Sequence, residues 1–320
     1  MKLGVLTVMM SSKPFEEALD YFAKAGLEAV ELGVGGYPGD AHVPVLELLG
    51  SAEKRKEFLG KIKSRGLEIS ALSVHGNPLH PDKDFARDHH EKFVNAVNLA
   101  NALDVKTVIT FSGCPGDSEG SKYPNWVTCA WPPDYQKILK WQWEEKVIPY
   151  WSKQAEFCKQ KGVRVGFEMH PGFVVYNTET MLRLRKSCGS NLGTNLDPSH
   201  LFWQGMDPCT VVRSLGKAIY HVHAKDTKVY QANASVNGVL DTKPYGGEME
   251  RSWIFRAVGF GHDRDFWCDF VSTLRMVGYD GVLSIEHEDS LMSANEGFMK
   301  AVTFLKDVLI SQKAGEAYWA

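Results

Sequence analysis

Eight short apolar runs alternate with helix-like stretches along the whole chain. The strands expected from these runs cover residues 3–9, 29–34, 68–74, 107–111, 163–167, 191–196, 218–220 and 282–285. The expected helices cover 13–24, 43–65, 84–103, 132–161, 178–186, 208–217, 265–277 and 294–310. Because strands that alternate with helical patterns form parallel βαβ units, the 320 residues predict an α/β fold, a single (β/α)8 TIM barrel domain over 1–320.

A doubly wound sheet is the competing architecture, and it usually carries a glycine-rich turn after its first strand. The stretch TVMMSS at 7–12 has no glycine, and the sequence contains no GxGxxG, Walker A, GxSxG or HExxH motif. The barrel is therefore favoured. Residues 227–249 show no periodicity and follow the seventh strand, so we expect a long loop over the active face. Residues 311–320 are expected to form a short C-terminal tail.

Four consecutive strands in the second half of the chain end on carboxylates or imidazoles. The residues at these ends are Glu168, Asp197, the pair His221 and His223, and Glu286. The carboxyl ends of barrel strands meet on one face, where the chemistry of this fold lies. A buried carboxylate is costly unless something pairs it, and a set of Glu, Asp, His and Glu suits a divalent metal of intermediate hardness. This pattern predicts a metal site on that face.

His221 and His223 lie two residues apart, so both side chains face the same side of their strand. Either could bind the metal. We prefer His223, which is nearer the open end of the barrel, and assign His221 to the layer below. This preference rests partly on the family resemblance described below.

Four further residues lie close to these strand ends and are predicted to bind substrate. His75 ends the third strand, His170 follows Glu168, His200 follows Asp197, and Lys225 follows His223. Each has a structural alternative. His200 could cap the next helix, His75 and His170 could be surface residues, and Lys225 could pair with Asp226 in a solvated loop.

Composition limits the class of partner. The formal net charge of -3 argues against nucleic acid or an anionic membrane as the main partner. No apolar run approaches the roughly 20 residues that span a bilayer. The six cysteines form no CxxC pair and indicate free thiols, so a cytoplasmic protein is expected.

A cluster of aromatic residues spans the loop and helix after the fourth strand. Its members are Trp126, Trp131, Trp141, Trp143, Tyr150 and Trp151. We interpret it as helix packing or as the interface of a homo-oligomer. In a second interpretation, Trp126 or Trp131 lies against the apolar face of a sugar ring.

The four motifs GFEMHPG, NLDPSH, HVHAKD and LSIEHED together resemble the xylose isomerase-like TIM-barrel superfamily, within its sugar phosphate isomerase/epimerase group. The resemblance covers nearly the whole chain. It implies one divalent ion, most often Mn2+, with Mg2+, Co2+ or Zn2+ as alternatives. The implied ligands are Glu168, Asp197, His223 and Glu286.

In the ketohexose epimerases of this superfamily the two metal-binding glutamates, here Glu168 and Glu286, are also the acid/base catalysts. The histidine that corresponds to His200 binds substrate. Val174 and Val229 stand where those epimerases carry a glutamate and an arginine, so ketohexose specificity does not follow.

The sequence therefore predicts a metal-dependent isomerase or epimerase of a sugar or keto-sugar, acting by proton transfer through a metal-bound enediolate. Its partner is a small-molecule sugar, and both phosphorylated and glycosidic substrates remain open. A metal-dependent lyase or dehydratase acting on a keto-inositol or a 3-keto-glycoside is the main alternative. An apurinic-site endonuclease is disfavoured by the net charge. A non-catalytic sugar-binding barrel would have lost the metal set.

Overall fold

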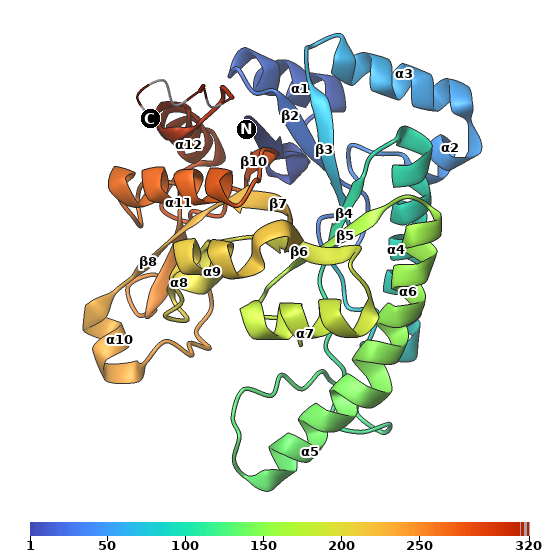
Figure 1. Cartoon of the computed structure of the whole chain (residues 1–320), viewed down its shortest axis with the longest axis vertical. Coiled ribbons are helices and arrows are strands. Elements are labelled where there is room, and N and C mark those ends of the chain that lie inside the picture. Colours follow the sequence, from blue (N-terminus) through green and yellow to red (C-terminus); the bar gives the residue numbers. More distant parts are fainter. Residues whose placement is uncertain (314, 317–318, 320) are drawn as a thin grey trace.

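Eight parallel strands close into a barrel in the order β1-β10-β7-β6-β5-β4-β3-β2, which confirms the predicted fold (Figure 1). The computed structural model describes residues 1–313, 315, 316 and 319, so part of the tail predicted at 311–320 lies outside the described residues. The barrel strands are β1 (Lys2–Leu6), β2 (Ala29–Gly33), β3 (Glu68–Ser73), β4 (Thr107–Thr110), β5 (Arg164–Glu168), β6 (Leu192–Leu196), β7 (Ile219–Ala224) and β10 (Val282–Ile285).

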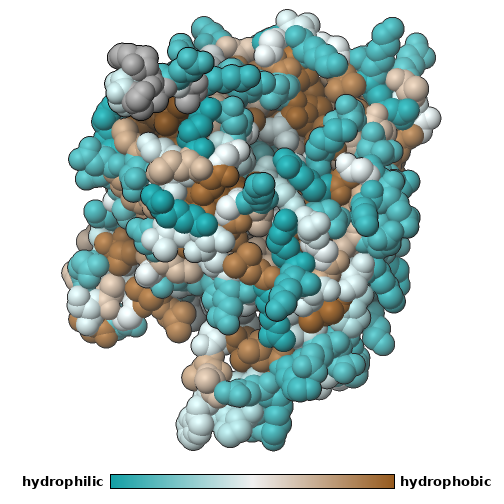
Figure 2. Space-filling view, in the orientation of Figure 1, coloured by the Kyte–Doolittle hydropathy of each residue, from teal (hydrophilic) through white to brown (hydrophobic). Residues whose placement is uncertain are grey.

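Helices follow the barrel strands and cover their outer faces. They are α1 (Phe15–Lys24), α2 (Val45–Gly50), α3 (Ala52–Lys63), α4 (Lys83–Leu103), α5 (Pro133–Trp141), α6 (Ile148–Gln160), α7 (Thr178–Cys188), α8 (Ser199–Phe202), α9 (Pro208–Leu215), α11 (Arg264–Met276) and α12 (Ala294–Val308). Their apolar faces pack on the barrel, where Phe93, Trp151 and Phe167 meet edge to face. Hydrophilic side chains predominate along the right edge of the molecule (Figure 2).

Two predicted elements near the N-terminus differ from the structure. The first strand ends at Leu6 rather than at residue 9, because Thr7–Met10 form a 3-10 turn. The helix predicted over 43–65 is divided into α2 and α3 at Ser51. The Ser51 side chain accepts a hydrogen bond from the backbone N–H of Lys54 and so begins a new helix.

The helix predicted over 132–161 is divided by a π-helical turn at Gln142–Val147. Pro149 lies in the first turn of α6. Proline lacks the N–H for a regular helical bond, and its ring crowds the carbonyl four residues earlier. A wider turn before Pro149 accommodates both effects, so the structure has a π-helical turn where a bend was predicted.

Residues 227–249 are not a loop without secondary structure, so that part of the prediction is wrong. They lie in an insertion that contains β8 (Asp226–Val229) and α10 (Gln231–Asn237), and β8 pairs antiparallel with β9 (Trp253–Arg256). The run WIF at 253–255 favours a strand, and its pairing with β8 was not predicted. We call residues 226–256 the β8–β9 insertion. It lies at the lower left of Figure 1.

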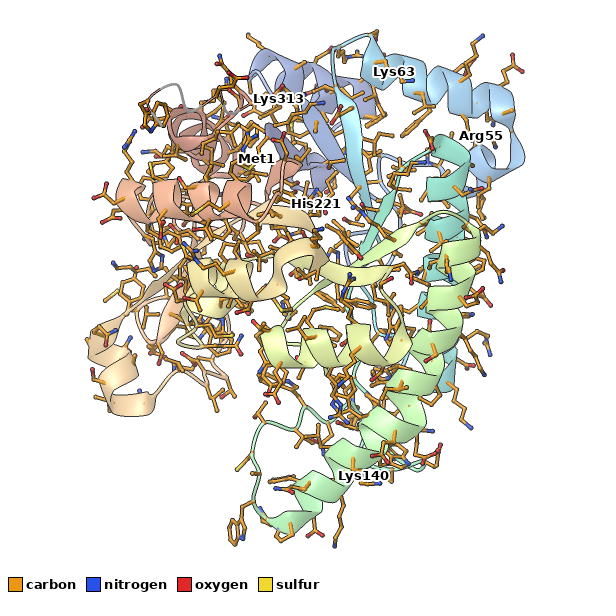
Figure 3. All side chains as sticks on the ribbon, in the orientation of Figure 1. Met1, Arg55, Lys63, Lys140, His221 and Lys313 are labelled. Atoms are coloured by element: carbon orange, nitrogen blue, oxygen red, sulfur yellow. The ribbon has the colours of Figure 1, made fainter. Side chains whose placement is uncertain are left out.

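Polar side chains fill the centre of the barrel near its carboxyl end. Glu31, Asn195, His221 and Ser284 are all buried there. His221 lies among the strands, whereas labelled basic side chains such as Arg55 and Lys140 lie at the periphery (Figure 3). This polar interior places a hydrogen-bonded layer directly beneath the predicted site.

The aromatic cluster serves mainly as packing. Trp143 and Trp151 are fully buried, whereas Trp131 is 74% exposed. Neither Trp126 nor Trp131 lines the cavity at the barrel mouth, so the sugar-stacking interpretation is wrong for that cavity. All six cysteines are free, as predicted. Within the described residues, no helix has the length and apolar character that crossing a membrane requires.

Candidate metal centre and active site

The four predicted metal ligands converge at the carboxyl end of the barrel. Glu168 ends β5, Asp197 follows β6, His223 lies on β7, and Glu286 follows β10. One potential ligand atom from each lies within 4.8 Å of those from the other three. Glu168, Asp197 and His223 are buried, and Glu286 keeps 16% of its side-chain surface exposed. Neighbouring parallel strands deliver these groups to one point because their ends are in register.

Two of these groups present buried atoms that no hydrogen bond satisfies among the described residues. They are His223 Nδ1 and Asp197 Oδ2, the latter 3.1 Å from its ion-pair partner Lys225 Nζ. Two carboxylate oxygens, Glu168 Oε2 and Glu286 Oε2, each lie 3.3 Å from His223 Nδ1. Several electron-rich atoms thus face one another in a buried space, an arrangement that a cation stabilises. The geometry and the donor set fit a divalent ion.

Glu31 on β2 holds the opposite nitrogen of His223, and the sequence reasoning missed it. Both oxygens of Glu31 lie 3.0 Å from His223 Nε2, and the carboxylate also accepts hydrogen bonds from Ser73 and Ser284. Burial would raise the pKa of Glu31, but the imidazoles of His223 and His221 outweigh it and lower the pKa to about 2. A glutamate inside a buried strand was the available signal.

His221 has no free ring nitrogen to offer a metal. Its Nδ1 lies 2.9 Å from Asn195 Oδ1, and its Nε2 lies 3.2 Å from Ser70 Oγ. Both nitrogens are therefore engaged by neighbouring side chains below the metal centre. This arrangement supports the choice of His223 as the ligand.

Glu168 receives hydrogen bonds from several directions. His75 Nε2 lies 3.0 Å from Oε2, His200 Nε2 lies 3.2 Å from Oε1, and Asn195 Nδ2 donates to Oε2 at 3.2 Å. Burial alone would raise the pKa of Glu168, but His75, His200 and His223 outweigh it and hold the pKa well below its usual range. The carboxylate is therefore ionised and fixed in orientation.

His170 lies beside Glu168 and His200 as a neutral imidazole. Its Nδ1 donates to the carbonyl oxygen of Pro171 at 2.6 Å, and its ring centre lies 4.1 Å from that of His200. Burial, with a smaller contribution from His200, lowers the pKa of His170 to about 3. The hydrogen bond to Pro171 leaves Nε2 as an acceptor.

Lys225 supplies a buried positive charge on the other side of the site. Its Nζ lies 2.6 Å from Glu286, 2.9 Å from Glu288 and 3.1 Å from Asp197. Burial would lower the pKa of Lys225, but these carboxylates outweigh it and raise the pKa well above its usual value. The alternative of a solvated loop pair is wrong, because both Lys225 and Asp226 are buried.

Asp226 faces away from the metal centre and organises the β8–β9 insertion. Its carboxylate accepts hydrogen bonds from the backbone N–H groups of Gly259, Gly261 and His262 at 2.9–3.1 Å. A Cβ on Gly261 would lie 2.4 Å from Asp226 Oδ1, so only glycine permits this approach. Asp226 therefore ties the chain after β9 to the start of β8.

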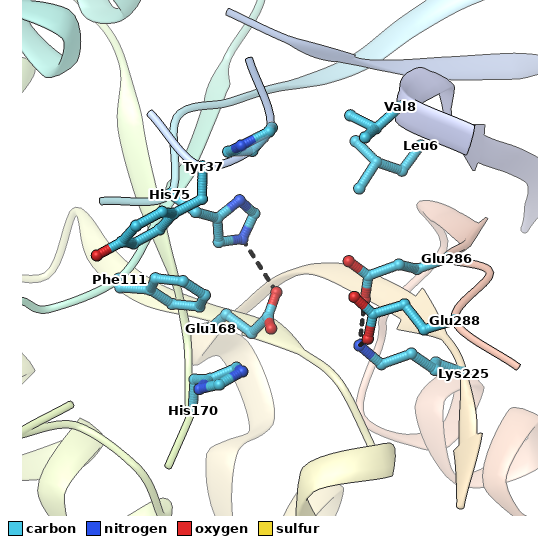
Figure 4. A pocket seen from close by; sticks show the side chains of 11 residues that line it. Leu6, Val8, Tyr37, His75, Phe111, Glu168, His170, Lys225, Glu286 and Glu288 are labelled. Carbon is cyan, nitrogen blue, oxygen red and sulfur yellow. Dashed lines mark hydrogen bonds and ion pairs between the residues drawn. The ribbon is translucent and has the colours of Figure 1, made fainter. Parts of the chain in front are cut away.

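A cavity of about 180 Å³, the inner cavity, opens between these groups. His75, Glu168 and His170 lie on one side, and Lys225, Glu286 and Glu288 lie on the other (Figure 4). All four residues predicted to bind substrate border this cavity or touch Glu168 in its wall. Whether they bind substrate stays a prediction.

The comparisons with known proteins agree with this geometry. The family described as xylose isomerase-like TIM barrel matches residues 19–308. Uncharacterized protein YfiH of Bacillus subtilis (strain 168) is 40% identical over 312 residues, covering 97% of this chain and 99% of that protein. Inosose dehydratase of Clostridium perfringens (strain 13 / Type A) is 25% identical over 296 residues, covering 92% and 89%.

Two solved structures share the fold at low sequence identity. The probable 3-DHS dehydratase AsbF of Bacillus anthracis superposes with a TM-score of 0.65 at 20% identity, covering 96% of this chain and 99% of that chain. D-psicose 3-epimerase of Clostridium cellulolyticum H10 superposes with a TM-score of 0.61 at 12% identity, covering 97% and 99%. At these identities the likeness concerns the fold alone.

Proposed function

The chain belongs to the xylose isomerase-like TIM barrel family, and from this premise we propose that it is a metal-dependent isomerase or epimerase of a sugar or keto-sugar. One observation carries the proposal. Glu168 and Glu286 approach the inner cavity from opposite sides, and both border the point that Asp197 Oδ2 and His223 Nδ1 face without hydrogen-bond partners in the described chain. Two carboxylates on opposite sides of one cavity can remove a proton from one face of a substrate and return a proton to the other face.

The chemistry begins with removal of a proton from the carbon next to a sugar carbonyl. When bound, a divalent ion supplies Lewis-acid polarisation of that carbonyl. Glu168 and Glu286 are placed to act as base and acid on the two faces of the substrate. Return of the proton to the opposite face of the same carbon gives an epimer, and return to the neighbouring carbon gives an isomer.

The remaining residues hold these two groups and the developing charge. His75, His200 and Asn195 fix the direction of the Glu168 carboxylate through their hydrogen bonds. Lys225, within 2.6 Å of Glu286, offers a positive charge to an enolate oxygen. Among the ions that suit this donor set we favour Mn2+, with Mg2+, Co2+ and Zn2+ as alternatives. We place the enzyme in the cytoplasm, which the free cysteines support.

Dehydration is the second candidate function, and the similarity to the inosose dehydratase of C. perfringens favours it. The first step is the same. If a hydroxyl lies on the carbon beta to the carbonyl, its C–O bond breaks as the C=C bond forms, and it leaves as water after taking one proton. The glutamate that has taken the substrate proton, Glu168 or Glu286, lines the same cavity and is placed to return that proton to the leaving hydroxyl.

The test is deuterium exchange. The Mn2+-loaded protein is incubated with a panel of keto-sugars in heavy water, and the carbons next to the carbonyl are followed by NMR. We expect exchange together with an epimer or isomer as product. The EDTA-treated protein is the matched control and should show no exchange. A product that has lost water indicates the dehydratase, and no exchange with any sugar favours a binding protein.

A further inference from the structure

A second cavity, the outer cavity, adjoins the inner one. It measures about 360 Å³ and is lined by His170, Tyr245, Ile254, Phe255, Glu288 and Ser290. His170 and Glu288 line both cavities, so the two meet at these residues. Ligand sites usually measure about 300–1,000 Å³. The inner cavity of about 180 Å³ is smaller than that range, and the two together fall within it.

One wall of the outer cavity is aromatic and begins beside the inner site. The Phe255 ring contacts the inner site, because Lys225 Nζ lies 4.6 Å from its centre and the His200 ring lies 5.4 Å from it, edge to face. Towards the outer side, the Tyr245 ring lies 5.6 Å from Phe255 at an angle of 19°. Phe255 is buried, whereas Tyr245 is 55% exposed. Tyr245 thus extends the wall from the metal centre towards solvent.

Arg251 holds this wall from behind. Its guanidinium carbon lies 4.4 Å from the Tyr245 ring centre and 4.7 Å from that of Trp253, and Arg251 is only 2% exposed. Arg251 also donates hydrogen bonds to the carbonyl oxygens of Trp253 and Lys243. A buried arginine that stacks on a partly exposed tyrosine fixes that ring in place without burying it.

The charges of the outer cavity exclude a phosphate. Its lining contains the carboxylate of Glu288 and, within the described chain, no lysine or arginine. Two cations lie next to this lining, and both are already engaged. Lys225 pairs with Asp197, Glu286 and Glu288, and Arg251 stacks behind Tyr245 and donates hydrogen bonds to backbone carbonyl oxygens. A neutral sugar ring fits this lining, since aromatic rings contact its C–H face while Glu288 and Ser290 accept hydrogen bonds from its hydroxyls.

We propose that the substrate is a neutral keto-glycoside of two rings. The ring that carries the carbonyl occupies the inner cavity beside Glu168 and Glu286, and the second ring lies on Tyr245 in the outer cavity. The role of the inner cavity rests on the proposed function. The role of the outer cavity rests on its own lining and can be tested by binding alone.

The experiment compares two substrates that share one reacting ring. They are 3-keto-trehalose, with two rings, and methyl 3-keto-α-D-glucopyranoside, with one. Deuterium exchange by the Mn2+-loaded enzyme should give a kcat/KM about 10-fold or more higher for the two-ring compound. Tyr245→Ala should bring the ratio of the two values close to one. Tyr123→Ala removes a tyrosine that is 76% exposed and lines neither cavity, and it should leave the ratio unchanged.

Each of the other outcomes tests either the two-ring substrate or the proposed function. Equal values for both compounds, or a preference for the 6-phosphate of the one-ring compound, would overturn the two-ring substrate and leave the proposed function standing. If no compound exchanges, the proposed function fails. Titration calorimetry with unoxidised trehalose and methyl α-D-glucopyranoside then tests whether the outer cavity binds a second sugar ring. If trehalose binds more tightly than methyl α-D-glucopyranoside and Tyr245→Ala abolishes the difference, the second-ring site is supported. Equal binding of the two compounds overturns it.

Discussion

Glu31 and His223 are 192 residues apart in the chain, and both oxygens of the Glu31 carboxylate lie 3.0 Å from His223 Nε2. When Nε2 carries the proton and donates a hydrogen bond to Glu31, the lone pair of Nδ1 points at the metal centre. The carboxylate thus fixes both the tautomer and the ring orientation of His223, as the outer partners of metal-binding histidines generally do.

Replacing Glu31 should therefore weaken metal binding without removing a ligand. We expect Glu31→Gln to lower Mn2+ affinity by about 10–100-fold, because the amide also presents N–H groups towards Nε2. Titration calorimetry on metal-free protein measures the effect. Glu28→Gln, an exposed glutamate near the start of the same strand, is the control and should bind Mn2+ like the wild type. An unchanged affinity in Glu31→Gln would remove Glu31 from the metal centre.

Removal of the metal should destabilise the protein. In the described chain His223 Nδ1 has no hydrogen-bond partner and Asp197 Oδ2 is engaged by an ion pair with Lys225 but by no hydrogen bond, so a metal ion would give both atoms a further bond. At about 100 times the dissociation constant, binding adds about 2.7 kcal/mol, which corresponds to a rise in Tm of several degrees. Thermal unfolding with EDTA and with excess Mn2+ measures this rise. Asp197→Ala should abolish it and the exposed-site change Asp134→Ala should not, whereas an equal rise in both variants would argue against the site.

His170 should make stability depend on pH. Its pKa is about 3 in the folded protein and close to 6.5 in the unfolded chain, so the unfolded chain binds the extra proton between these values. The contribution of neutral His170 to the free energy of unfolding is therefore fully present above about pH 6.5 and is lost as the pH drops towards 3. At about pH 5 the loss from this one group is about 2 kcal/mol. Urea unfolding of metal-free protein at neutral pH and at about pH 5 should show a loss smaller by this amount in His170→Gln. Equal losses would contradict a half-buried, neutral His170.

The strand ends made much of the fold and the centre of the site predictable. In a parallel barrel the carboxyl ends of all strands lie on one face, so Glu168, Asp197, the pair His221 and His223, and Glu286 could be brought together without coordinates. The choice of His223 within the pair also needed the family resemblance. Glu31 was harder to identify, because it lies inside β2 and its partner His223 is 192 residues away. A buried glutamate signals that it needs a partner, but the sequence does not say which one.

The outer wall of the site could not be predicted, for a different reason. Tyr245 and Phe255 reach the cavity only because β8 and β9 pair antiparallel and Arg251 stacks behind them. That pairing is a contact between short segments with weak periodicity, and it depends on register rather than on composition. The same stretch read without its partner strand predicts a loop.

Shortening the β8–β9 insertion should separate turnover from folding. Tyr230 N donates to Ser252 O at 2.8 Å, so the two chain segments are adjacent where β8 ends and β9 begins. Replacing residues 231–251 by Asn-Gly should close a two-residue hairpin and keep the strand pair. We expect the barrel to fold and turnover of a two-ring substrate to fall about 10-fold or more, since Tyr245 and Arg251 are lost. Circular dichroism and deuterium exchange measure the two effects. Unchanged turnover would show that the insertion does not cover the active face.

The last prediction concerns the two glutamates. Glu168→Gln and Glu286→Gln keep the shape of the side chain and one oxygen for the metal but remove the base. Each should fold, retain some Mn2+ and lower kcat by about 10²-fold or more, the usual scale of general acid–base catalysis. Glu288→Gln, which changes an exposed neighbour of Glu286, separates a general loss of charge from loss of a base and should lower kcat much less.

Deuterium exchange then tells the two roles apart. Substitution of the glutamate that removes the proton should abolish deuterium exchange into the substrate. Substitution of the glutamate that returns the proton should leave exchange into the substrate unchanged but stop formation of product. Because Glu168 is held by His75 and His200 while Glu286 pairs with Lys225, the two variants should differ in this way rather than fail alike. If both variants exchange and turn over like the wild type, neither carboxylate is the base, and His75, His170 or His200 must carry the proton.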